Sequence, residues 1–177
     1  MPSRDIWSHG SGTALRELLA SVLSNLLMQG ASTRAVYFSS PWMSDFPLFQ
    51  NHFGEFAALF PDRPDQVQIR FIDFLARLSE HRPVRLITVR NSTSEAFFRT
   101  PIWHECNGIE IRFAPETYHE KGVLAPDFYI DGSMNLTFSG VFIRDEKVTY
   151  YAEREPSARI SRAYLEFDRF WDGLALE

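Results

Sequence analysis

Apolar residues recur along this chain at two spacings, one typical of helices and one typical of strands. Apolar positions three and four residues apart predict helices over residues 13–30, 65–79, 92–103 and 156–173. Thr13 and Asp65 are the expected N-caps of the first two, and Pro156 is expected at the start of the last. Helical spacing places the leucine stripe of the first helix in the core.

Short runs rich in β-branched and aromatic residues lie between these helices and predict strands. The expected strands cover residues 34–39, 84–89, 109–113, 119–124, 127–130 and 147–152. Strands that alternate with helices predict the α/β class, as a sandwich whose mixed sheet has helices on both faces. Because there is no internal repeat, low-complexity tract or linker, residues 1–177 are expected to form a single domain.

Composition narrows the class of protein. Apolar residues make up 45% of the chain and aromatic residues 15%, which predicts a packed globular protein and excludes disorder. Cys106 is the single cysteine, so no internal disulfide is expected. We find neither a signal peptide nor an apolar run of membrane-spanning length, and expect a cytoplasmic protein with no membrane partner. His81, His104 and Cys106 lack a suitably spaced fourth ligand, so no metal site is expected.

Two short motifs bring together side chains suited to phosphodiester cleavage. His119-Glu-Lys121 supplies an imidazole and an ammonium group, and Gly132-Ser133-Met-Asn135 follows at a turn after the next predicted strand. A neutral imidazole is a competent nucleophile at phosphorus, and a protonated one can donate to the leaving oxygen. Lysine and asparagine can hold the charge on the other phosphate oxygens. The alternative is a buried hairpin with a core histidine and a polar turn.

This arrangement resembles the HxK…GSxN motif of the phospholipase D superfamily. The resemblance implies a metal-independent and cofactor-free phosphodiesterase that works through a covalent phosphohistidine. It also implies catalytic roles for His119, Lys121, Ser133 and Asn135, and contact of Gly132 with substrate. Since one motif is present and the chemistry uses two imidazoles, we expect a two-fold homodimer with both copies of His119 at one phosphate. The similarity is clearest over residues 34–151.

The motif departs from the family pattern at one acidic position. Members usually carry an aspartate five residues after the lysine, where this chain has Pro126, followed by Asp127. Either a bulge allows Asp127 to serve, or the acidic residue is absent. Glu146 lies where the family commonly has a further carboxylate, and it is expected to orient an imidazole or raise its basicity.

Charge gives an independent hint about the lysine. The chain contains 18 Lys plus Arg, of which only Lys121 and Lys147 are lysines, so the lysine in the motif suggests that a lysine is required there.

The net charge of −5 argues against indiscriminate binding to nucleic acid. A phosphodiester substrate would need a local basic face, for which the candidates are Arg85, Arg90, Arg99 and Arg112 with Lys121. The alternative is that these arginines are solvated or paired with neighbouring acids.

Within the superfamily, the chain looks most like the phospholipase D-like DpdK family, through the loop Ser40-Pro-Trp-Met-Ser-Asp-Phe-Pro-Leu48 and both motifs. That family is encoded with bacterial deazaguanine DNA-modification and restriction genes. The resemblance implies DNA as substrate, a role in defence, and possible restriction-protein partners. Trp42 and Asp45 are candidates for the substrate mouth; alternatively Trp42 plugs the core edge and Asp45 caps the next turn. A second hypothesis is a catalytically silent subunit that binds DNA or acts as a scaffold.

Overall fold

A mixed β-sheet forms the centre of the protein in the computed structural model, which describes residues 3–8, 13–104, 106–152 and 158–174. Within these ranges seven strands pair in the order β1-β9-β8-β7-β2-β5-β6. Their bounds are β1 Ser3–Trp7, β2 Val36–Ser39, β5 Val84–Val89, β6 Ile109–Ala114, β7 Gly122–Ala125, β8 Phe128–Gly132 and β9 Lys147–Ala152. Strands β2, β5 and β6 are parallel, and the other neighbours are antiparallel. The predicted mixed sheet is thereby confirmed.

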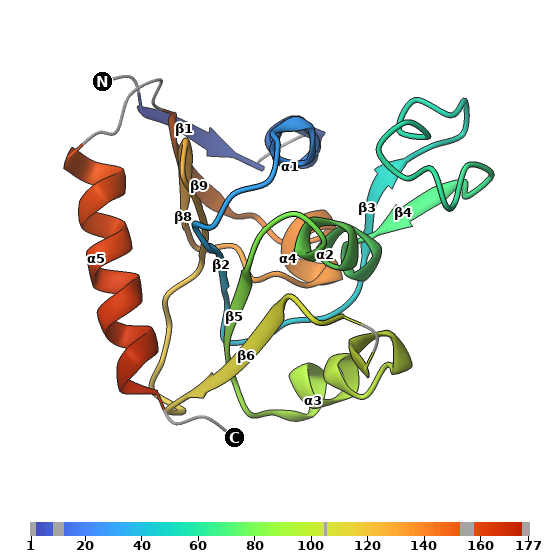
Figure 1. The fold of residues 1–177 in the computed structure, drawn as a ribbon. Coiled ribbons are helices and arrows are strands. Elements are labelled where there is room, and N and C mark those ends of the chain that lie inside the picture. Colours follow the sequence, from blue (N-terminus) through green and yellow to red (C-terminus); the bar gives the residue numbers. More distant parts are fainter. Residues whose placement is uncertain (1–2, 9–12, 105, 153–157, 175–177) are drawn as a thin grey trace.

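Helices cover both faces of this sheet, as the alternating pattern predicts (Figure 1). Their bounds are α1 Thr13–Met28, α2 Phe71–Ser79, α3 Ser92–Phe98, α4 Phe138–Phe142 and α5 Ala158–Gly173. Buried side chains of α1, α2, α3 and α4 belong to the larger apolar core on one face. Helix α5 packs on the other face around a smaller core that includes Tyr164, Phe167 and Trp171. The predicted α/β sandwich is confirmed.

Strand β2 shows why the sheet is apolar on both sides. Successive side chains of a strand point to opposite faces, so Val36 and Phe38 reach the larger core while Tyr37 reaches the α5 core. All three are fully buried. The sequence of a central strand that is covered by helices on both faces is therefore a continuous run of apolar residues.

A two-stranded hairpin that the sequence did not predict stands away from the main sheet (Figure 1). It consists of β3 (Pro47–Gln50) and β4 (Gln68–Arg70), with turns between them. Its pairing explains why the helix expected from Asp65 begins only at Phe71. Residues 68–70 form the ladder with β3, and the Asp73 carboxylate then accepts a hydrogen bond from the Arg70 N–H at 3.1 Å, which satisfies one of the free donors at the helix start.

Other predictions also differ from the structure or fall outside the described residues. The helix expected over residues 92–103 ends at Phe98 and gives way to a 3-10 turn at Pro101–His104, because proline lacks an N–H and disfavours helical backbone before it. Strand β1 was not predicted, since it is mostly exposed and polar. The start expected at Pro156 lies outside the described residues.

Candidate active site

The two motifs meet at one edge of the sheet because of strand direction. Strands β2 and β8 end at this edge, and β7 and β9, which are antiparallel to them, begin there. The register pairs Gly122 with both Ser39 and Asp131. The Gly132 N–H also donates to the Lys121 carbonyl oxygen at 3.3 Å. Residues that are eleven positions apart in the sequence, Lys121 and Gly132, are thus direct neighbours.

Two glycines allow the strands to approach this closely. A Cβ atom at Gly132 would lie 2.2 Å from the Lys147 carbonyl oxygen and 2.7 Å from the Val148 Cα. A Cβ atom at Gly122 would lie 2.4 Å from the Ile130 carbonyl oxygen. The backbone that approaches Gly132 is that of β9, and a residue with a side chain would not fit there.

Ser133 and Glu146 form a hydrogen-bonded pair beside this turn. The Ser133 hydroxyl donates to the Glu146 carboxylate and accepts from the Lys147 N–H at 3.0 Å. Glu146 is buried, and its own N–H donates to the Ser8 hydroxyl at 2.6 Å. Glu146 was expected to orient an imidazole. Among the described residues of one chain, the Glu146 carboxylate contacts Ser133, so this carboxylate fixes the hydroxyl group of the second motif.

Adjacent serines at the end of β2 connect the two halves of the site, and sequence reasoning missed them. Because strand side chains alternate, Ser39 points to the α5 face and Ser40 to the opposite face. The Ser39 hydroxyl lies 2.5 Å from that of Tyr118 and donates to the Glu120 carbonyl oxygen at 3.1 Å. The Ser40 hydroxyl lies 3.3 Å from the Asn135 Oδ1 and accepts from the Leu136 N–H at 3.1 Å. Both serines are fully buried. The sequence signal that could have identified them is a pair of polar residues at the end of an apolar strand.

His119 and Lys121 precede β7 rather than forming part of it, which corrects the strand predicted from residue 119. Strand β2 has no residue left to pair with them, since its last partner is Gly122. The segment is held by side chains instead. The Lys121 ammonium donates to the His119 carbonyl oxygen at 2.9 Å. His119 is exposed, so its imidazole is open to a substrate and is not the buried core histidine of the alternative interpretation.

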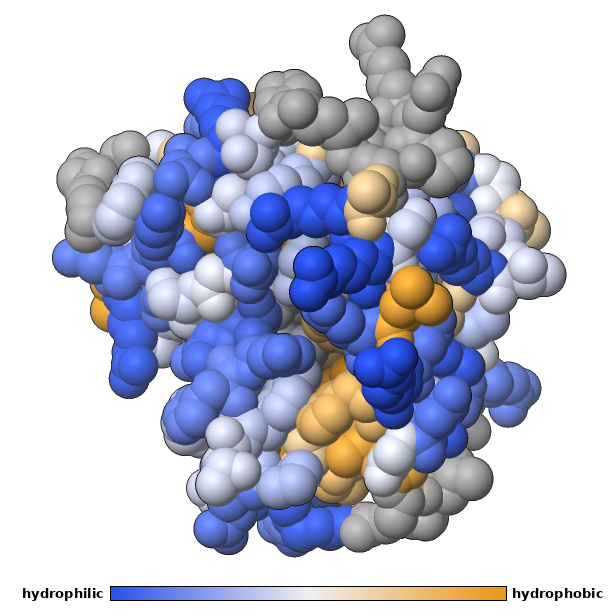
Figure 2. All heavy atoms as spheres, turned by 90° about the vertical axis from the view of Figure 1, so that its left-hand side faces the viewer, coloured by the Kyte–Doolittle hydropathy of each residue, from blue (hydrophilic) through white to orange (hydrophobic). Residues whose placement is uncertain are grey.

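The exposed His119 lines a hollow of about 830 Å³ between its own loop and α5, named here the α5-side hollow. Its lining is Pro115, Thr117, Tyr118, His119, Glu120, Tyr129, Glu166, Phe167, Arg169, Phe170, Gly173 and Leu174. Figure 2, which faces this side of the molecule, shows apolar side chains inside a hollow bordered by hydrophilic ones. The rings of Tyr118 and Phe170 are stacked in it at 5.0 Å.

The charged residues that line the α5-side hollow, apart from His119, are two carboxylates, Glu120 and Glu166, and one arginine, Arg169. Desolvation, together with the neighbouring charges of Asp131 and Glu166, raises the pKa of Glu120 above its usual value. Desolvation also raises the pKa of Asp131, against the lowering effect of Arg159. Negative charge is thus disfavoured on this side of the site.

A second hollow of about 510 Å³ lies on the opposite side of the site edge and contains no carboxylate; it is named here the α4-side hollow. Its lining is Trp42, Ser44, Thr93, Asn135, Thr137, Phe138, Ser139, Gly140 and Arg144. Asn135 is buried, and its position is fixed by Ser40. Helix α4 packs tightly there, because a Cβ atom at Gly140 would lie 2.3 Å from the Asn135 carbonyl oxygen. The site residues His119 and Asn135 therefore open into different hollows.

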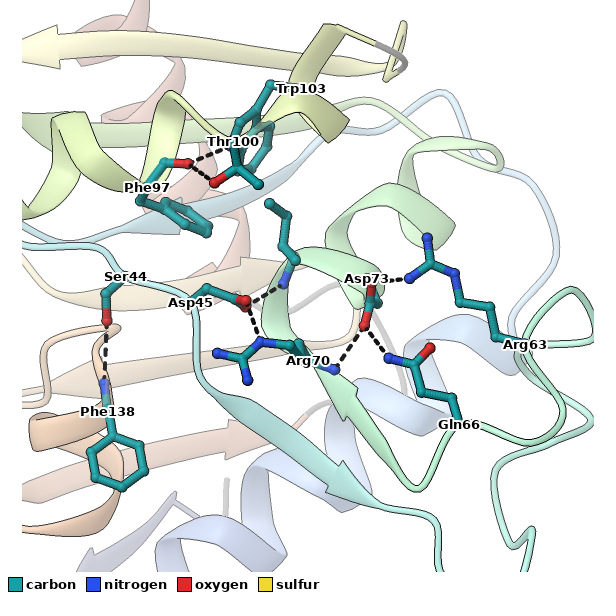
Figure 3. A network of polar contacts seen from close by, with 11 residues as sticks. Ser44, Asp45, Arg63, Gln66, Arg70, Asp73, Phe97, Thr100, Trp103 and Phe138 are labelled. Atoms are coloured by element: carbon teal, nitrogen blue, oxygen red, sulfur yellow. Dashed lines mark hydrogen bonds and ion pairs between the residues drawn. The ribbon is translucent and has the colours of Figure 1, made fainter.

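Of the two candidates for the substrate mouth, Trp42 lines this hollow and Asp45 does not. Figure 3 shows the Asp45 carboxylate directed at α2. It pairs with the Arg70 guanidinium and accepts a hydrogen bond from the Ile72 N–H at 3.1 Å. Asp45 therefore caps the start of α2, which is distant in the sequence, and not the next turn as the alternative interpretation had it. Trp42 is partly exposed, at 42%, so it does not plug the core edge.

Asp127 lies in the turn at the far end of the β7–β8 hairpin, away from His119. The hairpin register is regular, so no bulge carries this residue toward the site. Its carboxylate accepts a hydrogen bond from the Gln29 side chain at 2.7 Å, and the buried Arg82 is electrostatically coupled to it. Asp127 therefore links the β7–β8 hairpin to the segment after α1. Its role in this structure is to stabilise that contact.

The arginines proposed for a basic face are mostly engaged with neighbours. Arg85 lies 3.3 Å from the Asp168 carboxylate, Arg99 lies 3.5 Å from Glu95, and Arg90 lies 4.0 Å from Glu95. Arg112 donates to backbone carbonyls at the end of α5, including that of Leu174 at 3.1 Å. The alternative interpretation, paired arginines, fits these contacts. The exposed Arg144, which sequence reasoning did not select for a basic face, lines the α4-side hollow described above.

The described residues contain no group of three His, Cys, Asp or Glu side chains placed to hold a metal ion. In the same part of the chain, no helix has both the length and the apolar character needed to cross a bilayer.

No protein-family model and no curated protein sequence matches this chain. Solved structures do. A phospholipase D family member, Nuc from Salmonella typhimurium, superposes with a TM-score of 0.61 at 15% identity, over 99% of this chain and 97% of Nuc. This chain has the phospholipase D fold. NucT from Helicobacter pylori gives a TM-score of 0.59 at 11% identity, over 99% of both chains. TrmBL2, an archaeal chromatin protein, gives 0.57 at 7% identity, over the whole of this chain and 54% of TrmBL2.

Proposed function

We propose that this protein is a metal-independent phosphodiesterase of the phospholipase D superfamily that cleaves DNA. One observation carries the proposal: the sheet edge that presents the exposed His119 also presents Lys121, Ser133 and the buried Asn135, each held by a specific contact. The phospholipase D fold and the motif resemblance support the same chemistry. The four residues supply a nucleophile and the donors that a phosphoryl transfer needs.

In the proposed reaction, an imidazole nitrogen of His119 attacks phosphorus while the bond from phosphorus to the leaving oxygen breaks. A second, protonated imidazole donates its proton to that oxygen. Water then attacks the phosphohistidine and gives a proton to the second imidazole, the phosphorus–nitrogen bond breaks, and the phosphate product leaves with both histidines restored. Lys121 and Asn135 donate to the remaining oxygens, where charge accumulates, and Ser133, fixed by Glu146, adds a further donor.

The second imidazole is proposed to come from His119 of another copy of this chain in a two-fold dimer. Support comes from the exposure of His119 and from the single copy of the motif. The similarity of the loop after β2 to the DpdK family places the protein, in this proposal, beside DNA-modification and restriction proteins of a bacterial defence system.

The test is hydrolysis of bis(p-nitrophenyl) phosphate and of DNA in the presence of a chelator. His119→Ala should lower the rate by about 10²–10⁴-fold, and wild-type protein quenched in alkaline denaturant, in which a phosphorus–nitrogen bond survives, should carry a phosphohistidine detectable by mass spectrometry. His52→Ala, which removes an exposed histidine from the β3–β4 connection, is the matched control and should keep full activity. Unchanged cleavage by His119→Ala would show that the chemistry is assigned to the wrong residue.

The dimer has its own test. When wild-type and His119→Ala chains are co-expressed, activity should fall with the square of the wild-type fraction, because only dimers with two intact copies have both imidazoles. A linear fall, or a monomeric mass in solution for active protein, would refute the shared site.

A second candidate is a catalytically silent subunit that binds DNA or acts as a scaffold. Two observations favour it. The Lys121 ammonium is engaged by the carbonyl oxygen of His119 in its own chain, and the DNA-binding chromatin protein TrmBL2 shares the fold. In this case DNA binding should survive His119→Ala, and no phosphohistidine should be trapped from wild-type protein.

A further inference from the structure

The α4-side hollow contains an indole that is held in place and left uncovered. The backbone on both sides of Trp42 is fixed: the Ser40 hydroxyl donates to the Trp42 carbonyl oxygen at 2.6 Å, and the Met43 N–H donates to the Ser94 hydroxyl at 3.2 Å. Met43 itself is fully buried. The Trp42 side chain has no hydrogen bond or ring contact among the described residues, so one large aromatic surface is offered to solvent.

Phe138 presents a second ring in the same hollow from a different element. It is 46% exposed, and it is braced from behind by stacking on Phe142 at a centroid distance of 4.8 Å. Its N–H lies 3.4 Å from the Ser44 hydroxyl, which joins α4 to the loop that carries Trp42 (Figure 3). Two exposed rings from separate segments therefore line one hollow, on backbones that are tied together.

The charge of this hollow complements a phosphate group. Arg144 is exposed, and no carboxylate among the described residues forms an ion pair with it. The remaining polar lining consists of the Asn135 carboxamide and hydroxyl groups. The volume of about 510 Å³ is within the range of small-ligand sites.

We propose that the α4-side hollow binds an unpaired nucleobase next to the reacting phosphate, so that the substrate is single-stranded nucleic acid. Aromatic side chains that stack on bases, combined with a cation for the backbone, are how sequence-tolerant single-strand sites work. A base inside a duplex has both faces covered by its neighbours and cannot reach Trp42. The inference rests on the proposed function, because the shared residue Asn135 is what places the hollow beside the phosphate.

The α5-side hollow does not fit this role. It is also lined by aromatic rings, but its lining has two carboxylates, Glu120 and Glu166, against one cation, Arg169, so the phosphates beside a bound base would be attracted less there than beside Arg144. The strand is therefore directed from the reacting phosphate across α4 and not across α5.

The experiment measures binding in the His119→Ala background, so that no cleavage occurs. A fluorescently labelled single-stranded oligonucleotide and the matched duplex are titrated by anisotropy. His119→Ala should prefer the single strand. Adding Trp42→Ala should weaken single-strand binding by about 5- to 100-fold and change duplex binding little, because one base–aromatic stack is lost. Trp42→Phe should keep most of the affinity, which separates the loss of a ring from a folding defect.

Phe53→Ala is the matched control, since Phe53 is 90% exposed on the β3–β4 connection and outside the hollow. It should bind like its parent. Equal losses on single strand and duplex, or no loss with Trp42→Ala, would overturn the inference. Hydrolysis of bis(p-nitrophenyl) phosphate by wild-type protein reports separately on the proposed function. Activity without a Trp42-dependent single-strand preference would refute the inference alone, and the preference without activity would refute only the nuclease.

Discussion

The two faces of the sheet differ most where they meet the candidate site. On one face, α5 alone covers the strands and leaves an apolar hollow that is bordered by carboxylates and contains His119. On the other face, helices α1, α2, α3 and α4 enclose a larger core, and the α4-side hollow carries Asn135 and Arg144, which forms no ion pair with the described carboxylates. One sheet edge thus separates two electrostatic environments, and the α4 side, whose lining has an arginine and no carboxylate, is the more favourable approach for a polyanion.

The largest expected effect is a loss of stability when the packing of α5 on the sheet is disrupted. Trp171 is 1% exposed and receives the guanidinium groups of Arg85 and Arg112 over its ring at 5.1 and 4.5 Å. Trp171→Ala should lower the free energy of unfolding by about 3–5 kcal/mol, because a large cavity would form under α5. Urea denaturation measures this. Leu165→Ala, on the exposed side of the same helix, should change stability by less than about 0.5 kcal/mol. Similar losses in both variants would show that α5 is not held by this face.

The next effect tests the pair that fixes the second motif. Glu146→Gln removes the charge that accepts from the Ser133 hydroxyl, and should lower kcat by about 10- to 100-fold, the worth of a hydrogen bond to a charged group. Ser133→Ala should act through the same contact. The double variant should therefore be little worse than either single variant in a double-mutant cycle. Fully additive losses would mean that the two residues act independently.

Opposite charge changes on the two sides should have opposite signs. Arg144→Gln should weaken binding of a single-stranded oligonucleotide by about two- to fivefold at low salt, and Glu166→Gln should strengthen it by a similar or smaller factor, since both groups are exposed. Both differences should shrink as salt is raised. Anisotropy titrations at several salt concentrations measure them. A weakening in both variants would contradict the electrostatic difference between the hollows.

The smallest effect is a pH dependence of stability at Glu120. Because its pKa in the folded protein is raised, ionisation of this group opposes folding. The penalty is absent at about pH 3.5, below the usual pKa of a glutamate, and it grows as the pH rises through the raised pKa. Glu120→Gln should therefore be more stable than wild type near neutral pH, by a few tenths of a kcal/mol because the group is partly solvated, and equal to it in acid. Thermal unfolding at the two pH values checks this, and an advantage in acid would reverse the sign.

The local pattern of apolar residues was sufficient to predict those strands whose residues are themselves apolar or β-branched. Residues 84–89 and 147–152 were predicted as strands with the bounds that the structure shows, because runs of apolar and β-branched residues are a property of the segment itself. The start of α2 was wrong for the converse reason: residues 68–70 are recruited into a ladder with β3, a pairing that helical periodicity does not encode.

The sequence by itself determined the class of fold and the chemical groups of the candidate site, since spacing sets which faces are buried and the two motifs contain an imidazole, an ammonium, a hydroxyl and a carboxamide. Tertiary structure decided how those groups are held and what surrounds them. The contacts from Ser39 to Glu120 and from Ser40 to Asn135 join residues that are 81 and 95 positions apart. They depend on which strands become neighbours and on their direction. The same pairing places an acidic hollow on one side of the edge and a cationic one on the other, because the charge of a surface is summed over elements that only the fold brings together.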